Sequence, residues 1–218
     1  MGFNAKVVVT FTAAILLLIF SFLLFVHHSG YEKPIPLYTK TQPTIGSSQA
    51  KVHVVSFEDP KCNNCIVYHN QDYKKLYSSY IKTGMIRYTV YLVGELPNSS
   101  IICAALLCAN EQSTPSFFQL LDAYYKNPIL ALTPETIRNE LLTIAQNAAL
   151  PIDFTSLQRC VSSATFDKQV LENTNYARDI MGGVIKTPTV FVNGIRLVRP
   201  SYDQLTTLID IELKKGSS

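Results

Sequence analysis

The sequence predicts an α/β domain in which a βαβ unit and a ββα unit are separated by a mostly helical segment at residues 99–180. Three observations support this fold class. A nearly continuous apolar run at residues 51–57 is typical of a central parallel strand. Apolar and aromatic side chains then recur every three or four residues, which indicates a helix. Towards the C-terminus, Asn193-Gly194 between two β-rich runs predicts a hairpin.

The βαβ unit is completed by a β-rich run at residues 86–93, and a right-handed crossover is expected. Its helix is predicted from one face that contains Ile66, His69, Tyr73, Leu76 and Tyr80. In the middle segment, prolines divide the helices and Gly182-Gly183 ends the last one. The ββα unit has strands at residues 189–192 and 195–198, followed by a helix that opens with the capping box Ser201-x-x-Gln204.

The N-terminal region is predicted to lie outside this domain, which spans residues 51–218. Residues 7–26 contain no charge and are long enough to cross a bilayer, so residues 1–28 are predicted to be a transmembrane anchor. A cleavable signal peptide is the alternative, although the run is long for one and lacks an A-x-A site. Residues 29–50, with several Pro and Gly, are predicted to be an extended tether. An anchored domain would lie outside the cytoplasmic membrane, in a compartment where disulfides persist.

The charge balance excludes a strongly basic protein. Only 16% of the residues are charged, the net charge is +3, and the sequence has no Lys/Arg cluster. We therefore expect no nucleic-acid partner. The twelve Tyr residues are expected in the core and at its rim rather than around a cofactor. A monomer without a cofactor is predicted.

Two short motifs carry the chemistry. Cys62-Asn-Asn-Cys65 lies where the first strand gives way to the helix, and Lys186-Thr187-Pro188-Thr189 precedes the hairpin. A C-x-x-C motif holds either a zinc ion or a redox disulfide. Zinc is disfavoured because the other cysteines do not form a second C-x-x-C pair. The sequence therefore favours a redox disulfide and no metal.

The chain resembles the DsbA-like thiol–disulfide oxidoreductases of bacteria, which have a thioredoxin fold with an inserted helical domain. The resemblance covers about residues 50–213, and its most specific part is the Gly-Val-x-x-Thr-Pro-Thr pattern. Four segments carry it: Phe57–Cys65, residues 104–112 with Phe117-Phe118, residues 154–161, and residues 183–194. The insertion would correspond to residues 99–180.

The resemblance and the positions together suggest roles for the motif residues. Cys62 sits where the helix begins, and the unpaired N–H groups and the helix dipole there favour its thiolate, so we expect it to be the attacking sulfur. Cys65, one turn later, would resolve the mixed disulfide. The resemblance implies that Pro188 is cis and lies beside the sulfurs, and that Thr187 binds the substrate backbone.

The chain also departs from the family pattern. DsbA-type oxidants often have a histidine between the cysteines, whereas here the pair is Asn63-Asn64. Thioredoxin-like proteins often bury an acidic residue six positions before the first cysteine, and this chain has Ser56 at that position. The acids nearby, Glu58 and Asp59, are interpreted as solvated charges that Lys61 can offset. We therefore expect a weaker oxidant than the strongest family members.

Other candidate residues are expected to have structural roles. His69 is predicted to be a core or boundary residue rather than a catalyst. The family match places cysteines at Cys108 and Cys160, which some members bridge, so a structural disulfide is predicted with Cys103 as a buried free thiol. Three buried thiols are the alternative, because a free cysteine packs well as a small hydrophobe.

The predicted function is that of a periplasmic oxidase that introduces disulfides into secreted or envelope proteins and is reset by a membrane redox partner. Known isomerases of this kind have a separate N-terminal dimerisation domain, and residues 29–50 have no room for one, so an isomerase is disfavoured. A reductase is the alternative function. A non-catalytic chaperone or binding module is disfavoured by the presence of Cys62, Cys65 and Pro188.

Overall fold

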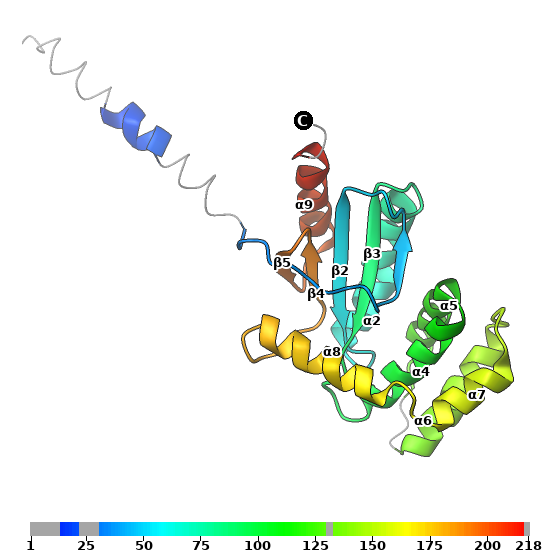
Figure 1. The fold of residues 1–218 in the computed structure, drawn as a ribbon. Helices are drawn as coiled ribbons and strands as arrows, with labels where there is room; N and C mark the ends of the chain where they lie inside the picture. The colour runs from blue at the N-terminus through cyan, green and yellow to red at the C-terminus, as the bar shows by residue number, and fades with distance from the viewer. Residues whose placement is uncertain (1–13, 22–30, 130–132, 216–218) are drawn as a thin grey trace, which may run out of the picture. The chain divides into compact units, whose positions relative to one another are not determined.

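The computed structural model describes residues 14–21, 31–129 and 133–215 (Figure 1). The chain divides into two units, Met1–Lys33 and Pro34–Ser218. In the first unit, residues 14–21 are helical and exposed, and the rest of the predicted anchor at residues 7–26 lies outside the described residues. None of the helices in the described part of the chain is both long and apolar enough to span a membrane.

The second unit is built on a mixed sheet. Within the described residues its strand order is β1-β3-β2-β4-β5, with β2 and β3 parallel and the other neighbours antiparallel. Strand β2 is central and buried except at the half-buried His53, which explains its nearly continuous apolar sequence. The strands are β1 (Thr44–Gly46), β2 (Val52–Glu58), β3 (Ile86–Leu92), β4 (Thr189–Val192) and β5 (Ile195–Val198).

Strand β1 corrects the predicted boundary of the domain. It pairs with the edge of β3, with Thr44 opposite Thr89. The preceding Gln42 is buried and exchanges side-chain hydrogen bonds of 2.8 and 3.2 Å with Asn173 of a distant helix. The prediction of an extended tether over residues 29–50 is therefore wrong for its C-terminal part. A strand of three residues is too short to show an alternating pattern in the sequence.

The helices follow the predicted order. The active-site helix is continuous from residue 63 to residue 81 and contains two π-helical stretches, which often mark functional sites. The predicted insertion at residues 99–180 runs from the start of α4 to the end of α8. The helices are α2 (Asn63–Tyr68), η1 (His69–Tyr73), α3 (Lys74–Leu76), η2 (Tyr77–Ile81), α4 (Ser99–Gln112), α5 (Thr114–Lys126), α6 (Pro134–Asn147), α7 (Phe154–Ser162), α8 (Asp167–Ile180) and α9 (Tyr202–Lys215).

The sheet carries a hydrophobic cluster on each face because side chains alternate along β2. Val52 and Val54 belong to the larger cluster, which includes the helical insertion and α9. Val55 and Phe57 belong to the smaller one, which α8 and the residues before β1 cover. The predicted capping box of α9 forms, because the Ser201 and Gln204 side chains each accept a hydrogen bond from the other residue's backbone N–H.

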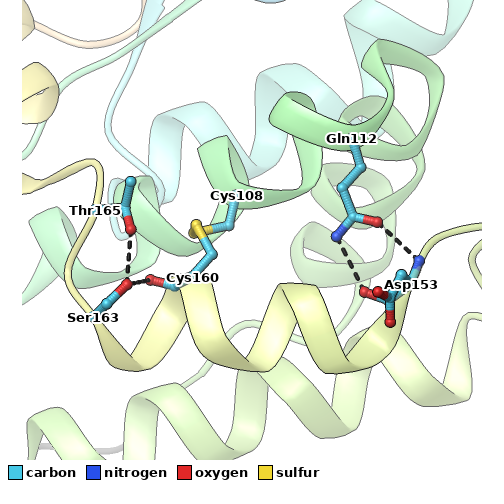
Figure 2. Close-up of a disulfide and its surroundings, with 6 residues drawn as sticks. All are labelled: Cys108, Gln112, Asp153, Cys160, Ser163 and Thr165. Carbon is cyan, nitrogen blue, oxygen red and sulfur yellow. Dashed lines mark hydrogen bonds between the residues drawn. A yellow bond between two sulfur atoms is a disulfide. The ribbon is translucent and has the colours of Figure 1, made fainter.

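Helices α4 and α7 of the insertion are linked at two points (Figure 2). The sulfurs of Cys108 and Cys160 are bonded at 2.06 Å, across 52 positions of sequence. Further along, the Gln112 amide donates to the Asp153 carbonyl oxygen at 3.1 Å and accepts from its N–H at 2.8 Å. Asp153 also caps α7 through its carboxylate. The disulfide therefore lies in the helical insertion, on residues different from the C-x-x-C motif.

Candidate active site

The two cysteines of the C-x-x-C motif differ in exposure. Cys62 is the residue before α2, with extended backbone angles, and Cys65 lies in the first turn of that helix. The Cys65 N–H donates to the Cys62 carbonyl oxygen at 2.9 Å. Cys62 is partly exposed, whereas Cys65 is fully buried. An external thiol can therefore reach Cys62 but not Cys65.

The surroundings shift the pKa values of the two thiols in opposite directions. The hydrogen bond from the Cys65 side chain is the main factor that lowers the pKa of Cys62 to about 5. Thr187 and the backbone N–H groups of Cys65 and Asn64 act in the same sense, while burial opposes them. Burial raises the pKa of Cys65 well above its ordinary value. In the reduced protein at neutral pH, Cys62 is therefore the thiolate and Cys65 the thiol that donates to it.

The Thr-Pro motif meets the cysteines because β4 pairs with β2. Phe57 lies opposite Thr189, and this register brings the residues just before β4 to the end of β2. The Thr187–Pro188 peptide bond is cis. The carbonyl oxygen of Thr187 lies 3.5 Å from the Cys62 sulfur and accepts a hydrogen bond from it when Cys62 is protonated. Two motifs that are 125 positions apart thus form one site.

Glu58 differs from the sequence prediction of a solvated charge. Its side chain is 0% exposed. Its two carboxyl oxygens accept hydrogen bonds from the hydroxyls of Tyr88 at 3.2 Å and Tyr125 at 3.1 Å. Burial raises the pKa of Glu58, and its charge contributes to the raised pKa of Cys65. The structure therefore places a buried acid near Cys65, four positions before Cys62.

Asp59 is also buried, so its interpretation as a solvated charge is wrong as well. Its carboxylate accepts hydrogen bonds from the N–H groups of Lys61, Glu95 and Leu96 and from the Ser99 hydroxyl, at 2.8 to 2.9 Å. Burial raises the pKa of Asp59, and these hydrogen bonds oppose the rise. Asp59 therefore ties the active-site turn to the loop that leads into α4.

His69 packs between aromatic side chains. It is buried, its ring stacks against Tyr73 and lies tilted against Tyr125, and its Nε2 lies 3.6 Å from the Asp122 carboxylate of α5. It joins the active-site helix to the insertion, in agreement with its predicted core position. Cys103 is a buried free thiol whose sulfur lies 3.5 Å from the Val93 carbonyl oxygen.

No group of three or more His, Cys, Asp or Glu side chains suited to a metal ion occurs in the described part of the chain. The partners of Glu58 come from β3 and α5, far along the chain, so no local pattern predicts their hydrogen bonds. A local signal for its burial is that Glu58 directly follows a nearly continuous apolar run.

The family described as thioredoxin matches residues 38–211. The chain belongs to the thioredoxin family. A Bacillus anthracis relative, named "Probable disulfide bond formation protein D", is 28% identical over 95% of this chain and 95% of its own length. A Rickettsia felis protein named as a protein-disulfide oxidoreductase is 25% identical over 84% of this chain, which spans 65% of that protein's length.

Solved structures of related proteins have the same fold as this chain. Chlamydia trachomatis DsbA superposes with a TM-score of 0.72 at 23% identity, covering 83% of this chain and 96% of that one. Oxidised BdbD from Bacillus subtilis gives a TM-score of 0.72 at 23% identity, covering 84% and 97%. Together with the named relatives, these structures confirm the predicted resemblance to DsbA-like proteins.

Proposed function

We propose that this thiol–disulfide oxidoreductase acts as a dithiol oxidase, which introduces disulfides into secreted or envelope proteins through a Cys62–Cys65 disulfide. The observation that carries the proposal is the lowered pKa of the accessible Cys62 beside the raised pKa of the buried Cys65. A site that stabilises the thiolate stabilises the reduced form, which makes the disulfide a stronger oxidant.

The reaction requires two thiol–disulfide exchanges. A substrate thiolate attacks the Cys62 sulfur, the Cys62–Cys65 bond breaks, and Cys65 leaves with the electron pair and takes up a proton. A second substrate thiolate then attacks the substrate sulfur of the mixed disulfide and releases Cys62 as a thiolate. Two electrons pass from the substrate to the enzyme, and the substrate gains one disulfide.

The surrounding residues support these two steps. The hydrogen bond from the Cys65 thiol stabilises Cys62 as a leaving thiolate in the second step. Glu58 is the buried acid whose charge acts on Cys65, and we propose that it exchanges the proton that Cys65 takes up. Thr187 and cis-Pro188 stand beside Cys62, where they would bind the extended backbone of the substrate.

A reductase is the second candidate. Asn63-Asn64 puts no positive charge between the cysteines, so the thiolate lacks the cationic donor that a histidine at this place would supply. The absence of this charge favours a redox potential below that of the strongest oxidants. A protein with such a potential can also reduce substrate disulfides.

For localisation, we propose that the domain lies in the periplasm, anchored by residues 7–26 and reset by a membrane redox partner. The charge-free apolar run supports the anchor. The Cys108–Cys160 bond suits an oxidising compartment. N-terminal sequencing of the mature protein tests the anchor: a chain that begins near residue 29 would show a cleaved signal peptide instead.

The redox potential in a glutathione buffer tests the direction. An oxidase is expected to lie nearer to the roughly −120 mV of strong oxidants than to the roughly −270 mV of thioredoxin-type reductants. An oxidase should also oxidise a reduced dithiol peptide rapidly and reduce the disulfides of insulin slowly. A potential near the reductant value, with fast insulin reduction and no peptide oxidation, would overturn the proposed direction.

A further inference from the structure

Arg199, directly after β5, has an unusual backbone conformation for a residue with a long side chain. Its φ is +48°, in the left-handed region that non-glycine residues rarely adopt. Residues in such conformations often persist where function requires them. The Arg199 N–H donates to the Pro188 carbonyl oxygen at 2.8 Å, so the strained residue is hydrogen-bonded to the cis-proline loop.

The side chain of Arg199 points to the same loop. Its Nε–H donates to the Thr187 carbonyl oxygen at 3.4 Å, and the same oxygen lies 3.5 Å from the Cys62 sulfur. The guanidinium nitrogen and the nucleophilic sulfur are therefore at most about 7 Å apart, a range over which charges still interact at a protein surface. Arg199 is exposed, so a bound substrate can contact its guanidinium group.

Two lysines add to this charge. Lys61 directly precedes Cys62 and is partly exposed, and Lys186 directly precedes Thr187 and is exposed. Neither they nor Arg199 take part in an ion pair within the described ranges. The acids nearest to Lys61 in sequence, Glu58 and Asp59, are buried and already hydrogen-bonded. Asp203, four positions after Arg199, is exposed and forms no ion pair with it in the part of the chain that the structure describes.

We propose that Lys61, Lys186 and Arg199 form a basic rim that selects substrates with an acidic side chain close to the cysteine to be oxidised. The occupant is an extended peptide segment, lying along the cis-proline loop, with an Asp or Glu near its cysteine. The proposal rests on the oxidase function above and adds a substrate preference to it. Charge complementarity of this kind acts on encounter and binding, so it is expected in KM rather than in kcat.

The Arg199→Gly variant removes the positive charge and is expected to leave the fold unchanged. Glycine adopts the left-handed conformation without strain, and the backbone N–H to Pro188 is kept. Arg199→Lys keeps a positive charge, so it should retain most of the preference. Lys82→Gln removes an exposed lysine at the far end of the active-site helix and is the matched control.

The experiment measures kcat/KM for three reduced dithiol peptides that differ only in Glu, Gln or Lys beside the first cysteine. The wild type is expected to prefer the Glu peptide over the Gln peptide by about two- to fivefold, with the Lys peptide slowest. The preference should fall towards one in Arg199→Gly and in high salt, and stay unchanged in Lys82→Gln.

Two results would overturn the inference: equal rates for the three peptides in the wild type, or an Arg199→Gly variant that slows all three equally. In both cases oxidation of the Gln peptide shows that the proposed function stands. Failure to oxidise any peptide would instead contradict the oxidase function itself.

Discussion

The lowered pKa of Cys62 predicts that the reduced protein becomes more stable as the pH rises from 5 to 7. The folded value is about 5, against an ordinary value of 9.0. Because the folded pKa is the lower one, the thiolate contributes its full stabilisation above the unfolded pKa. This stabilisation declines as the pH falls and is lost near pH 5, where folded Cys62 is protonated.

The magnitude follows from the pH interval. Between pH 5 and pH 7 the folded protein carries a thiolate while the unfolded chain carries a thiol, and each pH unit contributes about 1.4 kcal/mol. Because Cys62 is partly exposed, we discount the resulting value for solvent screening, which leaves about 2 kcal/mol in the free energy of unfolding.

The assay is urea unfolding of the reduced protein at pH 5 and pH 7, with Cys62→Ala as the matched control. Other titrating groups, such as the buried Glu58, contribute to both proteins and largely cancel in the comparison. The wild type is expected to gain about 2 kcal/mol more than Cys62→Ala over this interval. If both proteins change equally with pH, the thiolate is not stabilised by the fold and the oxidase argument loses its basis.

Three further predictions concern the cysteines and the buried acid. Cys62→Ser should abolish exchange, whereas Cys65→Ser should accumulate mixed disulfides with substrates, detectable on non-reducing gels. Cys108→Ala should lower the unfolding free energy of the oxidised protein by up to about 4 kcal/mol, from the chain entropy of a 52-position loop, and leave peptide oxidation near normal. In a Cys62→Ser background, Glu58→Gln should lower the pKa of Cys65, measured from alkylation rates against pH, because it removes a nearby negative charge.

Each of these has a contrary result. Faster iodoacetamide labelling of Cys65 than of Cys62 would reverse their roles. Alkylation of Cys108 in the unfolded, non-reduced protein would show that the structural disulfide is absent. An unchanged or higher Cys65 pKa after Glu58→Gln would show that the acid does not act on that thiol.

Local signals in the sequence were enough to predict much of this protein. The hairpin at Asn193-Gly194, the Ser201 capping box and the limits of the insertion all depend on residues close together in the chain, and the structure agrees with each. The order of the elements also indicated the fold. Because β4 pairs with β2, the C-x-x-C motif after β2 and the Thr-Pro motif before β4 lie at the same end of the sheet.

Only the tertiary structure decided the electrostatics of the site. Glu58 and Asp59 look like surface charges until β3, α4 and α5 cover them and supply hydroxyl and N–H donors from distant positions. The three-residue β1 joins the sheet only because the edge of β3 is there to pair with it. Arg199 reaches the Thr187 carbonyl oxygen through a left-handed backbone that no local pattern predicts. Burial and long-range hydrogen bonds set charge and pKa, and both depend on which segments pack together rather than on which residues are neighbours in the chain.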